Sequence, residues 1–231
     1  MRPPILLAAS LLVAGCVAAI PNPTVPVGLR PIASTDVAHW ARATAPTAPF
    51  RITFTWRGRL NDDMHGGKGT LIYSPADSLQ LHTQFSLGIG PNYDAAIVGD
   101  SALWAEPKEE VEKLVPSYHL LWAMIAIARP PGAGWTTESH QDAKVTSVRY
   151  THGSDTVDYV TVHTGQQRLE TRVVIGGRPL GQVWAYFDQF RNVTNTRLQL
   201  LTSPVLLELV FAKKAPQRAT DRDGWTAPHD H

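Results

Sequence analysis

The amino-acid sequence predicts a mainly β protein of the α+β class: a strongly curved antiparallel half-barrel whose concave face is covered by short helices. Two observations carry this prediction. Apolar and polar residues alternate with a period of two over much of the chain, which is typical of half-buried antiparallel strands. Residues 120–128 are apolar at every position and therefore indicate a fully buried helix. We expect about eleven strands, and a sheet of that size tends to curl.

The first half of the chain predicts one helix and five strands. Ser34 to Asp36 offer N-cap chemistry for a short helix that carries Trp40. From Phe50 the alternating pattern begins, with Pro, Gly, Asn and Asp clusters marking the turns. The expected strands are 50–57, 69–73, 79–87, 93–98 and 101–105, with turns at 61–67, 74–77 and 99–100.

Two helices and a second set of strands follow. A short amphipathic helix is expected over 108–115, with Glu109 and Lys113 spaced for an i,i+4 ion pair. Pro116 ends it, and a second helix is expected over 118–128. Because this second helix is apolar on all sides, we expect it to plug the concave side of the sheet. The remaining expected strands are 145–151, 156–163, 168–175, 180–187, 196–201 and 205–212.

The N-terminus has the parts of an export signal. Arg2 supplies a positive charge, an apolar core runs from Ile5 to Ala14, and a small residue precedes Cys16, the only cysteine of the chain. A core of about ten residues is too short to span a bilayer, which takes about twenty. The pattern is that of a lipobox, so we expect cleavage before Cys16 and acylation of its sulfur. A conventional signal-peptidase cut near Ala18-Ala19 is the alternative.

Composition limits the classes of partner. Removal of residues 1–15 takes one of the 21 Lys and Arg side chains and leaves 20, against 20 Asp and Glu. This balance, without a basic run, argues against nucleic acid as a partner. The predicted organisation is a signal peptide over 1–15, an acylated N-terminus with a Pro-rich tether over 16–33, one domain over 34–212 and a disordered tail over 213–231. With no second cysteine, the domain folds without a disulfide.

The order of these elements resembles the LolA/LolB-like family of bacterial lipoprotein carriers and receptors. The resemblance covers residues 34–212 and includes the lipobox, the helix with Trp40, three long strands ending at Leu87-Gly88, the segment VGDSALWA (98–105), the helical lid and the C-terminal strands. It implies an apolar cavity for acyl chains inside the half-barrel. The tethered receptor LolB is the more similar member, because the soluble carrier has no acylated cysteine. Where that family has a mobile apolar loop, the turn 61–67 offers only Met64.

The resemblance also implies an address and a ligand. Several acyl chains on one cysteine anchor a protein stably, and Val17, in place of the aspartate that retains lipoproteins in the inner membrane, favours the outer membrane. We therefore expect a monomeric lipoprotein facing the periplasm that binds acyl chains of lipidated clients, in lipoprotein localisation or outer-membrane biogenesis. Plain core packing is the alternative role of each candidate lining residue. The candidate lining residues are Phe54, Trp56, Leu81, Phe85, Trp122, Met124, Ile125, Trp184 and Tyr186.

The sequence contains no motif for nucleophilic, metal-dependent or phosphate-binding chemistry. We interpret the acidic run 62–65 as a solvated turn and expect no enzyme, metal site or cofactor. Two other functions stay open. A sensor or assembly module would be favoured by Arg51, Arg57 and Arg59 exposed on a convex or edge surface. An enzyme acting on lipid or cell wall would be favoured by a buried acid–base pair in a cleft.

Overall fold

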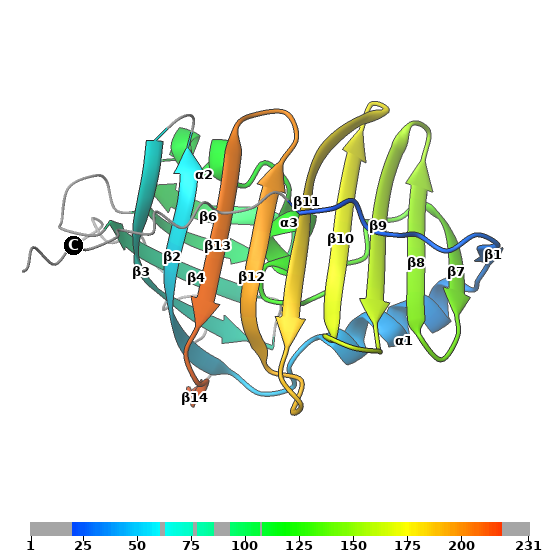
Figure 1. Ribbon diagram of the computed structural model, residues 1–231, viewed down its shortest axis with the longest axis horizontal. Coiled ribbons are helices and arrows are strands. Elements are labelled where there is room, and N and C mark those ends of the chain that lie inside the picture. Colours follow the sequence, from blue (N-terminus) through cyan, green and yellow to red (C-terminus); the bar gives the residue numbers. More distant parts are fainter. Residues whose placement is uncertain (1–19, 61–62, 76–77, 86–92, 107, 219–231) are drawn as a thin grey trace, which may run out of the picture.

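The structure is a computed structural model that describes residues 20–60, 63–75, 78–85, 93–106 and 108–218. These residues form a single antiparallel sheet that bends strongly and does not close (Figure 1). The strand order is β1-β7-β8-β9-β10-β11-β12-β13-β2-β3-β4-β5-β6, with β14 paired to β2. The predicted half-barrel is confirmed, and the described residues contain fourteen strands rather than eleven, two of them only two residues long.

The helices and strands have the following bounds. The helices are α1 (Ser34–Thr44), α2 (Lys108–Leu114) and α3 (Tyr118–Ala123). The strands of the first half are β1 (Arg30–Pro31), β2 (Phe50–Leu60), β3 (Asp63–Ser74), β4 (Ser78–Phe85), β5 (Tyr93–Val98) and β6 (Ser101–Glu106). Those of the second half are β7 (Thr136–Gln141), β8 (Val145–His152), β9 (Asp155–Val162), β10 (Arg168–Ile175), β11 (Arg178–Phe187), β12 (Val193–Leu200), β13 (Val205–Phe211) and β14 (Ala215–Pro216).

Strand pairing separates the side chains into two faces, because successive residues of a strand point to opposite sides and paired residues share a side. Val183 pairs with Leu198, and Leu198 pairs with Leu207. This row is buried and continues on β2 to the side of the sheet that carries Phe54 and Trp56. We call this side the inner face. The opposite side, which carries the alternate residues, is the outer face.

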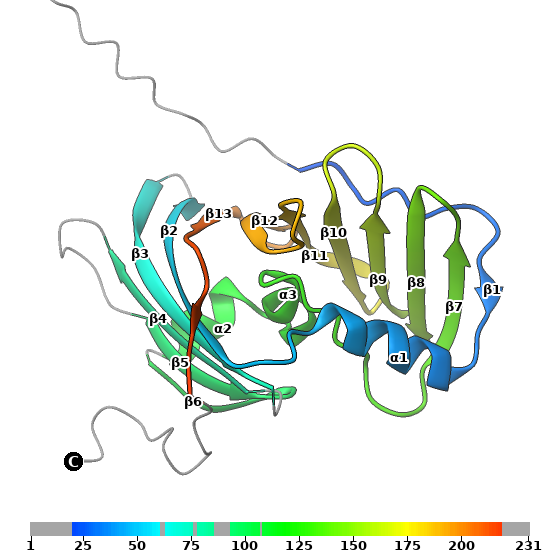
Figure 2. The same cartoon turned by 90° about the horizontal axis from the view of Figure 1, so that it is seen from below.

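The helices lie on the inner face, and α3 occupies its centre between the two halves of the sheet (Figure 2). Residues 120–128 are all buried, as predicted. The helix approaches β11 closely because Gly181 has no side chain: a Cβ there would lie 2.9 Å from Leu120 Cδ1. Trp40 of α1 packs against Tyr159 of β9, with ring centroids 6.1 Å apart. The central apolar segment is therefore a plug, as expected.

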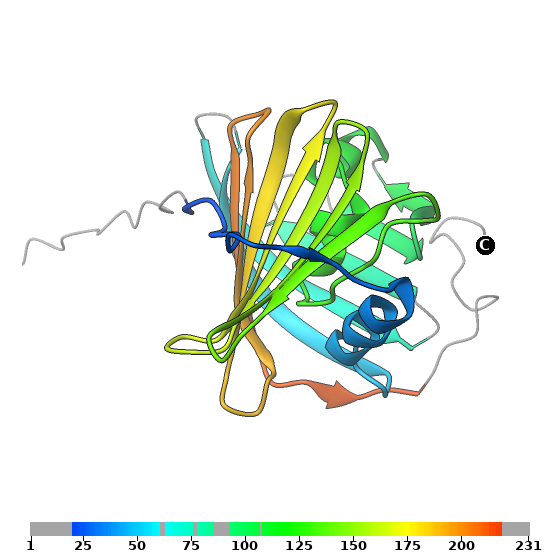
Figure 3. The ribbon, with the colours of Figure 1, turned by 90° about the vertical axis from the view of Figure 1, so that its right-hand side faces the viewer.

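Residues 20–29, which we call the strap, cross the outer face before β1 pairs with the edge strand β7 (Figure 3). Ile20 is only 4% exposed. Its N–H donates to Gln199 Oε1 (3.0 Å), and its carbonyl accepts from Gln182 Nε2 (2.7 Å). Further along, the Thr24 N–H donates to the carboxylate of Glu170. Residues 20–33 are thus packed on the domain, although the sequence predicted a tether for them.

Four other boundaries differ from the predictions. Residues 63–67, expected within the turn 61–67, belong to β3 and pair with β2, so that the interpretation of 62–65 as a solvated turn is wrong for residues 63–65. Strand β7 was missed, because its polar sequence TTESHQ shows no apolar alternation at the edge of the sheet. Helix α1 is capped by Ala33, so that Ser34, the expected cap, lies inside the helix. Part of the expected tail is ordered, since β14 pairs with β2 and Lys214 Nζ lies 4.6 Å from the Phe50 ring centroid. Residues 219–231 lie outside the described residues.

Candidate functional site

The α3 plug is fixed to both halves of the sheet by side-chain hydrogen bonds. Trp122 Nε1 donates to the Gly99 carbonyl in the β5–β6 turn (2.9 Å), and its ring meets Tyr73 of β3 edge-on at 6.4 Å. On the other side, Thr196 of β12 donates to the Met124 carbonyl (2.8 Å). Thr44 at the end of α1 accepts from the Ala128 N–H (2.9 Å). Neighbouring strands and α1 therefore hold the plug in one place.

The helix ends at Ala123, five residues before the predicted end at residue 128, because the chain closes it with a C-terminal capping turn. The Ile127 N–H donates to the Trp122 carbonyl and the Ala126 N–H to the Ala123 carbonyl, the two bonds of a Schellman motif. Ala126 takes the left-handed position, with φ at 63°. Glycine is usual there, so the sequence carries no stop signal at this position. Met124 and Ile125 are buried in this turn.

The end of the plug carries a polar cluster, which we call the latch: His119, Arg129, Tyr159 and Asp100. Arg129 Nε donates to Asp100 Oδ1 (2.8 Å). The Arg129 carbonyl accepts from the Tyr159 hydroxyl (2.8 Å) and lies 3.1 Å from His119 Nδ1, which must carry the proton to donate to it. Burial lowers the pKa of His119, and the hydrogen bond to the Arg129 carbonyl offsets part of that effect. The fold therefore favours neutral His119.

The lowered pKa of His119 predicts a loss of stability in mild acid. In the unfolded chain His119 takes up a proton near pH 6.5, the ordinary pKa of histidine, whereas the folded protein resists protonation. This contribution to the free energy of unfolding is complete above the unfolded pKa and is lost as the pH falls through the folded one. Urea unfolding at about pH 7.5 and about pH 5 measures the drop.

The matched control for this prediction is His119→Asn, whose amide nitrogen lies near the position of Nδ1 and can donate to the Arg129 carbonyl, and which cannot titrate. We expect a smaller drop in the free energy of unfolding for the variant than for the natural protein. Equal drops in the two proteins would show that other groups cause the acid sensitivity.

The inner face of the β2–β3 hairpin carries an alternation of aromatic residues and glycine. Phe54 pairs with Gly69, and Trp56 pairs with Gly67. We call these four residues the inner aromatic patch. Phe54 is buried against Phe211, with ring centroids 5.7 Å apart, whereas Trp56 is only half-buried. The glycines add no side chain that would cover Trp56, which therefore keeps part of its apolar surface accessible on the inner face.

Strand register divides the nine predicted lining residues. Phe54 and Trp56 lie on the inner face, and Trp122, Met124 and Ile125 lie in the plug that covers it. The backbone of β4 pairs Leu81 with Leu71 and Phe85 with Gly67, but the side chains of Leu81 and Phe85 lie outside the described part of the structure. Cys16 also lies outside the described residues.

The register contradicts the grouping of Trp184 and Tyr186 with the other lining residues. Trp184 pairs with Glu170 and Arg197, and these residues alternate with the buried inner row that contains Val183. Both aromatic side chains therefore lie on the outer face. There the Arg168 guanidinium lies 4.6 Å from the Trp184 ring centroid. The physical reason is space: α3 approaches the inner side of β11 so closely at Gly181 that a Cβ there would lie 2.9 Å from Leu120 Cδ1, and the inner neighbours Val183 and Ala185 are fully buried.

A pocket of about 240 Å³ lies beside the plug on the inner side. Its apolar lining includes Ile125, Leu169 and Phe187, and two cations, Arg191 and Lys214, also line it. Burial lowers the pKa of Lys214, and nearby Asp188 offsets part of the shift. The lining is mixed, since Thr44 and Thr161 also contribute to it, and a pocket of this kind suits the anionic group of a ligand better than its acyl chain. The sequence pattern did not indicate it, because its residues come from six separate segments.

A second hollow, of about 600 Å³, lies over β13, β2 and β3. The exposed side chains that line it, among them Thr55, Lys68 and Val210, belong to the outer face. We call it the outer groove. Arg51, Arg57 and Arg59 share the outer face of β2 with Thr53 and Thr55, at every second position, and are exposed. The convex arginine surface that would favour an interaction module is therefore present.

Like Asp158, which is paired with Arg149, Glu170 is a buried acid on the outer face, at 3% exposure. Burial raises its pKa, and Arg168 opposes that shift through an ion pair at 2.6 Å. Its position under the strap and its bond to Thr24 give it a structural role. Among the described residues, no group of three or more His, Cys, Asp or Glu side chains is placed to hold a metal ion. Within the same part of the chain, no helix is long and apolar enough to cross a membrane.

Comparison with solved structures identifies the fold. A LolA superfamily protein from Nitrosomonas europaea superposes with a TM-score of 0.50 and 12% sequence identity, over 85% of this chain and 98% of that one. A putative outer membrane lipoprotein-sorting protein domain from Vibrio parahaemolyticus gives a TM-score of 0.37 and 10% identity, over 81% and 94% of the two chains. A DUF1329 family protein from Desulfovibrio piger gives 0.31 and 9%, over 80% and 92%.

Sequence comparisons add nothing to this result: no protein-family model matches the chain, and neither does any curated protein. The superposition on the Nitrosomonas europaea protein confirms the predicted LolA/LolB-like fold. At 12% sequence identity this similarity shows the fold alone.

Proposed function

We propose that this protein is a periplasm-facing lipoprotein that binds the acyl chains of lipidated clients on the inner face of its half-barrel. In this proposal the acylated Cys16 anchors it in the outer membrane, and it acts as a monomer in lipoprotein localisation or outer-membrane biogenesis. The fold supports the proposal because an open, curved sheet offers one long apolar face that its short helices cover only in part.

The observation that carries the proposal is the half-buried Trp56 in the inner aromatic patch. It is a large apolar ring that stays partly exposed on the inner face, beside two glycines that add no side chain to cover it. Burial of a methylene is worth about 0.8 kcal/mol, so a sixteen-carbon chain offers on the order of 12 kcal/mol before costs. Ordering of the ligand consumes much of this, which leaves room for the release that a carrier requires.

The hydrogen bonds of α3 restrict where the chain can bind. Displacing the plug would break the bonds of Trp122, Thr196 and Thr44 together, and each partner left buried without a bond costs about 1–3 kcal/mol. We therefore assign α3 the role of a fixed wall. In this proposal the acyl chain lies beside it, on the inner face of the β2–β3 hairpin, and the pocket at Ile125, which Arg191 and Lys214 line, takes an anionic group of the client.

Native mass spectrometry of residues 16–231 with Cys16→Ser tests the proposal. We expect co-purified lipid or lipopeptide, or uptake of a synthetic palmitoylated lipopeptide in titration and none of the same peptide without its acyl chain. A clean apo mass without uptake at any lipopeptide concentration would contradict it. That outcome would favour the second candidate, a protein-interaction module that uses the exposed Arg51, Arg57 and Arg59.

The anchor has its own check on the protein purified from membranes. An N-terminal peptide beginning at Cys16 and carrying acyl mass is expected. A mature N-terminus at Ile20 without acyl mass would show that conventional cleavage occurs and that the lipobox interpretation is wrong.

A further inference from the structure

The strap fixes which face of the domain lies near the anchoring membrane. Ile20 is held on the outer face by Gln182 and Gln199. Between Cys16 and Ile20 the chain has four residue steps, which span at most about 14 Å when fully extended. If Cys16 is acylated, as the proposed function requires, the outer face at Gln199 stays within that distance of the lipid attachment point.

The register shows what surrounds this point. Gln199 pairs with Leu206 of β13, and Leu206 pairs with Arg59 of β2. Adjacent strands lie about 4.8 Å apart, so the backbone of Arg59 is about 10 Å from that of Gln199. Four residues further along the same two strands, Val210 pairs with Thr55, and the outer groove begins there.

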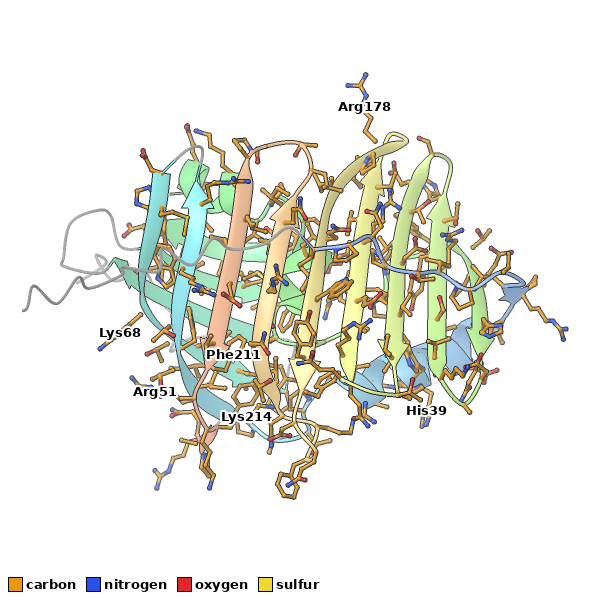
Figure 4. The ribbon with its side chains drawn as sticks, in the orientation of Figure 1. His39, Arg51, Lys68, Arg178, Phe211 and Lys214 are labelled. Atoms are coloured by element: carbon orange, nitrogen blue, oxygen red, sulfur yellow. The ribbon has the colours of Figure 1, made fainter. Side chains whose placement is uncertain are left out.

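The charge of this surface fits an anionic partner. Arg51, Arg59 and Lys68 are exposed, and none of them has an ion-pair partner among the described residues. Arg57 is different, because it forms an ion pair with Glu208, the residue opposite it on β13. Figure 4 shows Arg51 and Lys68 at the same end of the molecule, on the neighbouring strands β2 and β3. The chain as a whole is almost neutral, so attraction of an anionic partner has to come from the cations of one surface and not from the net charge.

Apolar side chains lie among the cations. Val210, in the groove, is 51% exposed, and Met64, which pairs with Arg59 at the start of β3, is 53% exposed. Cations with long aliphatic stems and scattered exposed apolar groups are the composition of surfaces that lie at a membrane interface. A soluble acidic partner would match the charge, but the short tether argues for lipid.

We propose that the outer face around the outer groove docks on the anionic headgroups of the membrane that holds Cys16. This inference rests on the proposed acylation and goes beyond it. The anchor supplies attachment, and the cations Arg51, Arg59 and Lys68 supply orientation. With the outer face against lipid, the inner face and its aromatic patch point away from the anchoring membrane, toward arriving clients.

Orientation is measured on the acylated protein in vesicles of phosphatidylcholine containing one quarter phosphatidylglycerol. Cys16 is the only cysteine, so a fluorophore on Thr55→Cys labels the outer groove alone once Cys16 is acylated. The matched control is His39→Cys, on the exposed side of α1 at the other end of the molecule (Figure 4). We expect a lipid with a headgroup quencher to quench Thr55→Cys several-fold more than His39→Cys. Equal quenching, or stronger quenching at His39, contradicts the proposal and leaves this face to a soluble partner.

A charge comparison tests the cations directly, on unacylated protein with Cys16→Ser. Each cation near an anionic surface is worth about 1 kcal/mol, or about fivefold in binding, so Arg51→Gln, Arg59→Gln and Lys68→Gln together are expected to weaken vesicle binding about hundredfold. The control removes three exposed cations elsewhere, Arg42→Gln, Lys144→Gln and Arg178→Gln. Equal weakening by both triple variants would show attraction by net charge only and overturn the proposal.

These outcomes are independent of client binding. Acyl mass at Cys16 is verified first, and lipopeptide uptake is read by native mass spectrometry, which needs no membrane. If the protein takes up lipopeptide but the Thr55→Cys label is not preferentially quenched, only the docking proposal is contradicted. If the label is preferentially quenched but no lipopeptide is taken up, only the proposed function is contradicted.

Discussion

Replacing Trp122 with alanine is expected to lower the free energy of unfolding by about 4 kcal/mol, the usual cost of removing a fully buried tryptophan. Trp122 is 1% exposed, donates to the Gly99 carbonyl and packs against Tyr73. In a domain of this size the loss lowers the melting temperature by roughly 8–16 °C. Urea unfolding, followed by circular dichroism, measures it.

The conservative variant Trp122→Phe separates packing from hydrogen bonding. It keeps most of the ring but leaves the Gly99 carbonyl without its donor, so we expect a loss of about 1–3 kcal/mol. A loss below about 1 kcal/mol for Trp122→Ala would contradict the account of α3 as a fixed wall, since a mobile lid contributes little to the cooperative core.

Replacing Trp56 with glutamine is expected to weaken binding of a palmitoylated lipopeptide about thirtyfold, or about 2 kcal/mol, the scale of a central binding residue. Trp184→Gln is the matched control. It removes the same side chain from the same sheet, but from the outer face. We expect it to leave the affinity unchanged. Titration calorimetry, with the unacylated peptide as the blank, measures both variants.

Two results would count against this prediction. If Trp184→Gln weakened binding as much as Trp56→Gln, the acyl chain would lie on the outer face. If neither variant changed the affinity, the inner aromatic patch would have no part in binding. Thermal unfolding of both variants verifies that the comparison is made between folded proteins.

The sheet was predictable from sequence wherever one face is apolar and the other polar. Strand β10 was predicted with its exact bounds, 168–175, and the hairpin of β5 and β6 around Gly99 was predicted as well. Strand β7 was not, because an edge strand with polar residues on both sides has no alternation to detect. The strap was missed for a related reason. Its prolines break any period, and the side chains that hold it, Gln182 and Gln199, come from distant strands.

The site was harder to predict than the fold. Alternation shows that Trp184 and Tyr186 share a face, but only the position of α3 decides which face is inside. A prediction from the sequence places the larger apolar side chains of β11, Trp184 and Tyr186, on the inner face. In the structure α3 occupies the inner side of β11, and Gly181 faces it. The latch was also missed, since His119, Arg129 and Tyr159 carry no motif and meet only through the fold.

The most direct test of the central claim maps where an acyl chain lies. A lipopeptide whose palmitoyl chain ends in a diazirine is photo-crosslinked to the protein and the adducts are located by tryptic mapping. We predict adducts on the peptide of residues 52–57, which carries Phe54 and Trp56 between Arg51 and Arg57. Adducts confined to the peptide of residues 173–191, on the outer-face residues Trp184 and Tyr186, would contradict the claim.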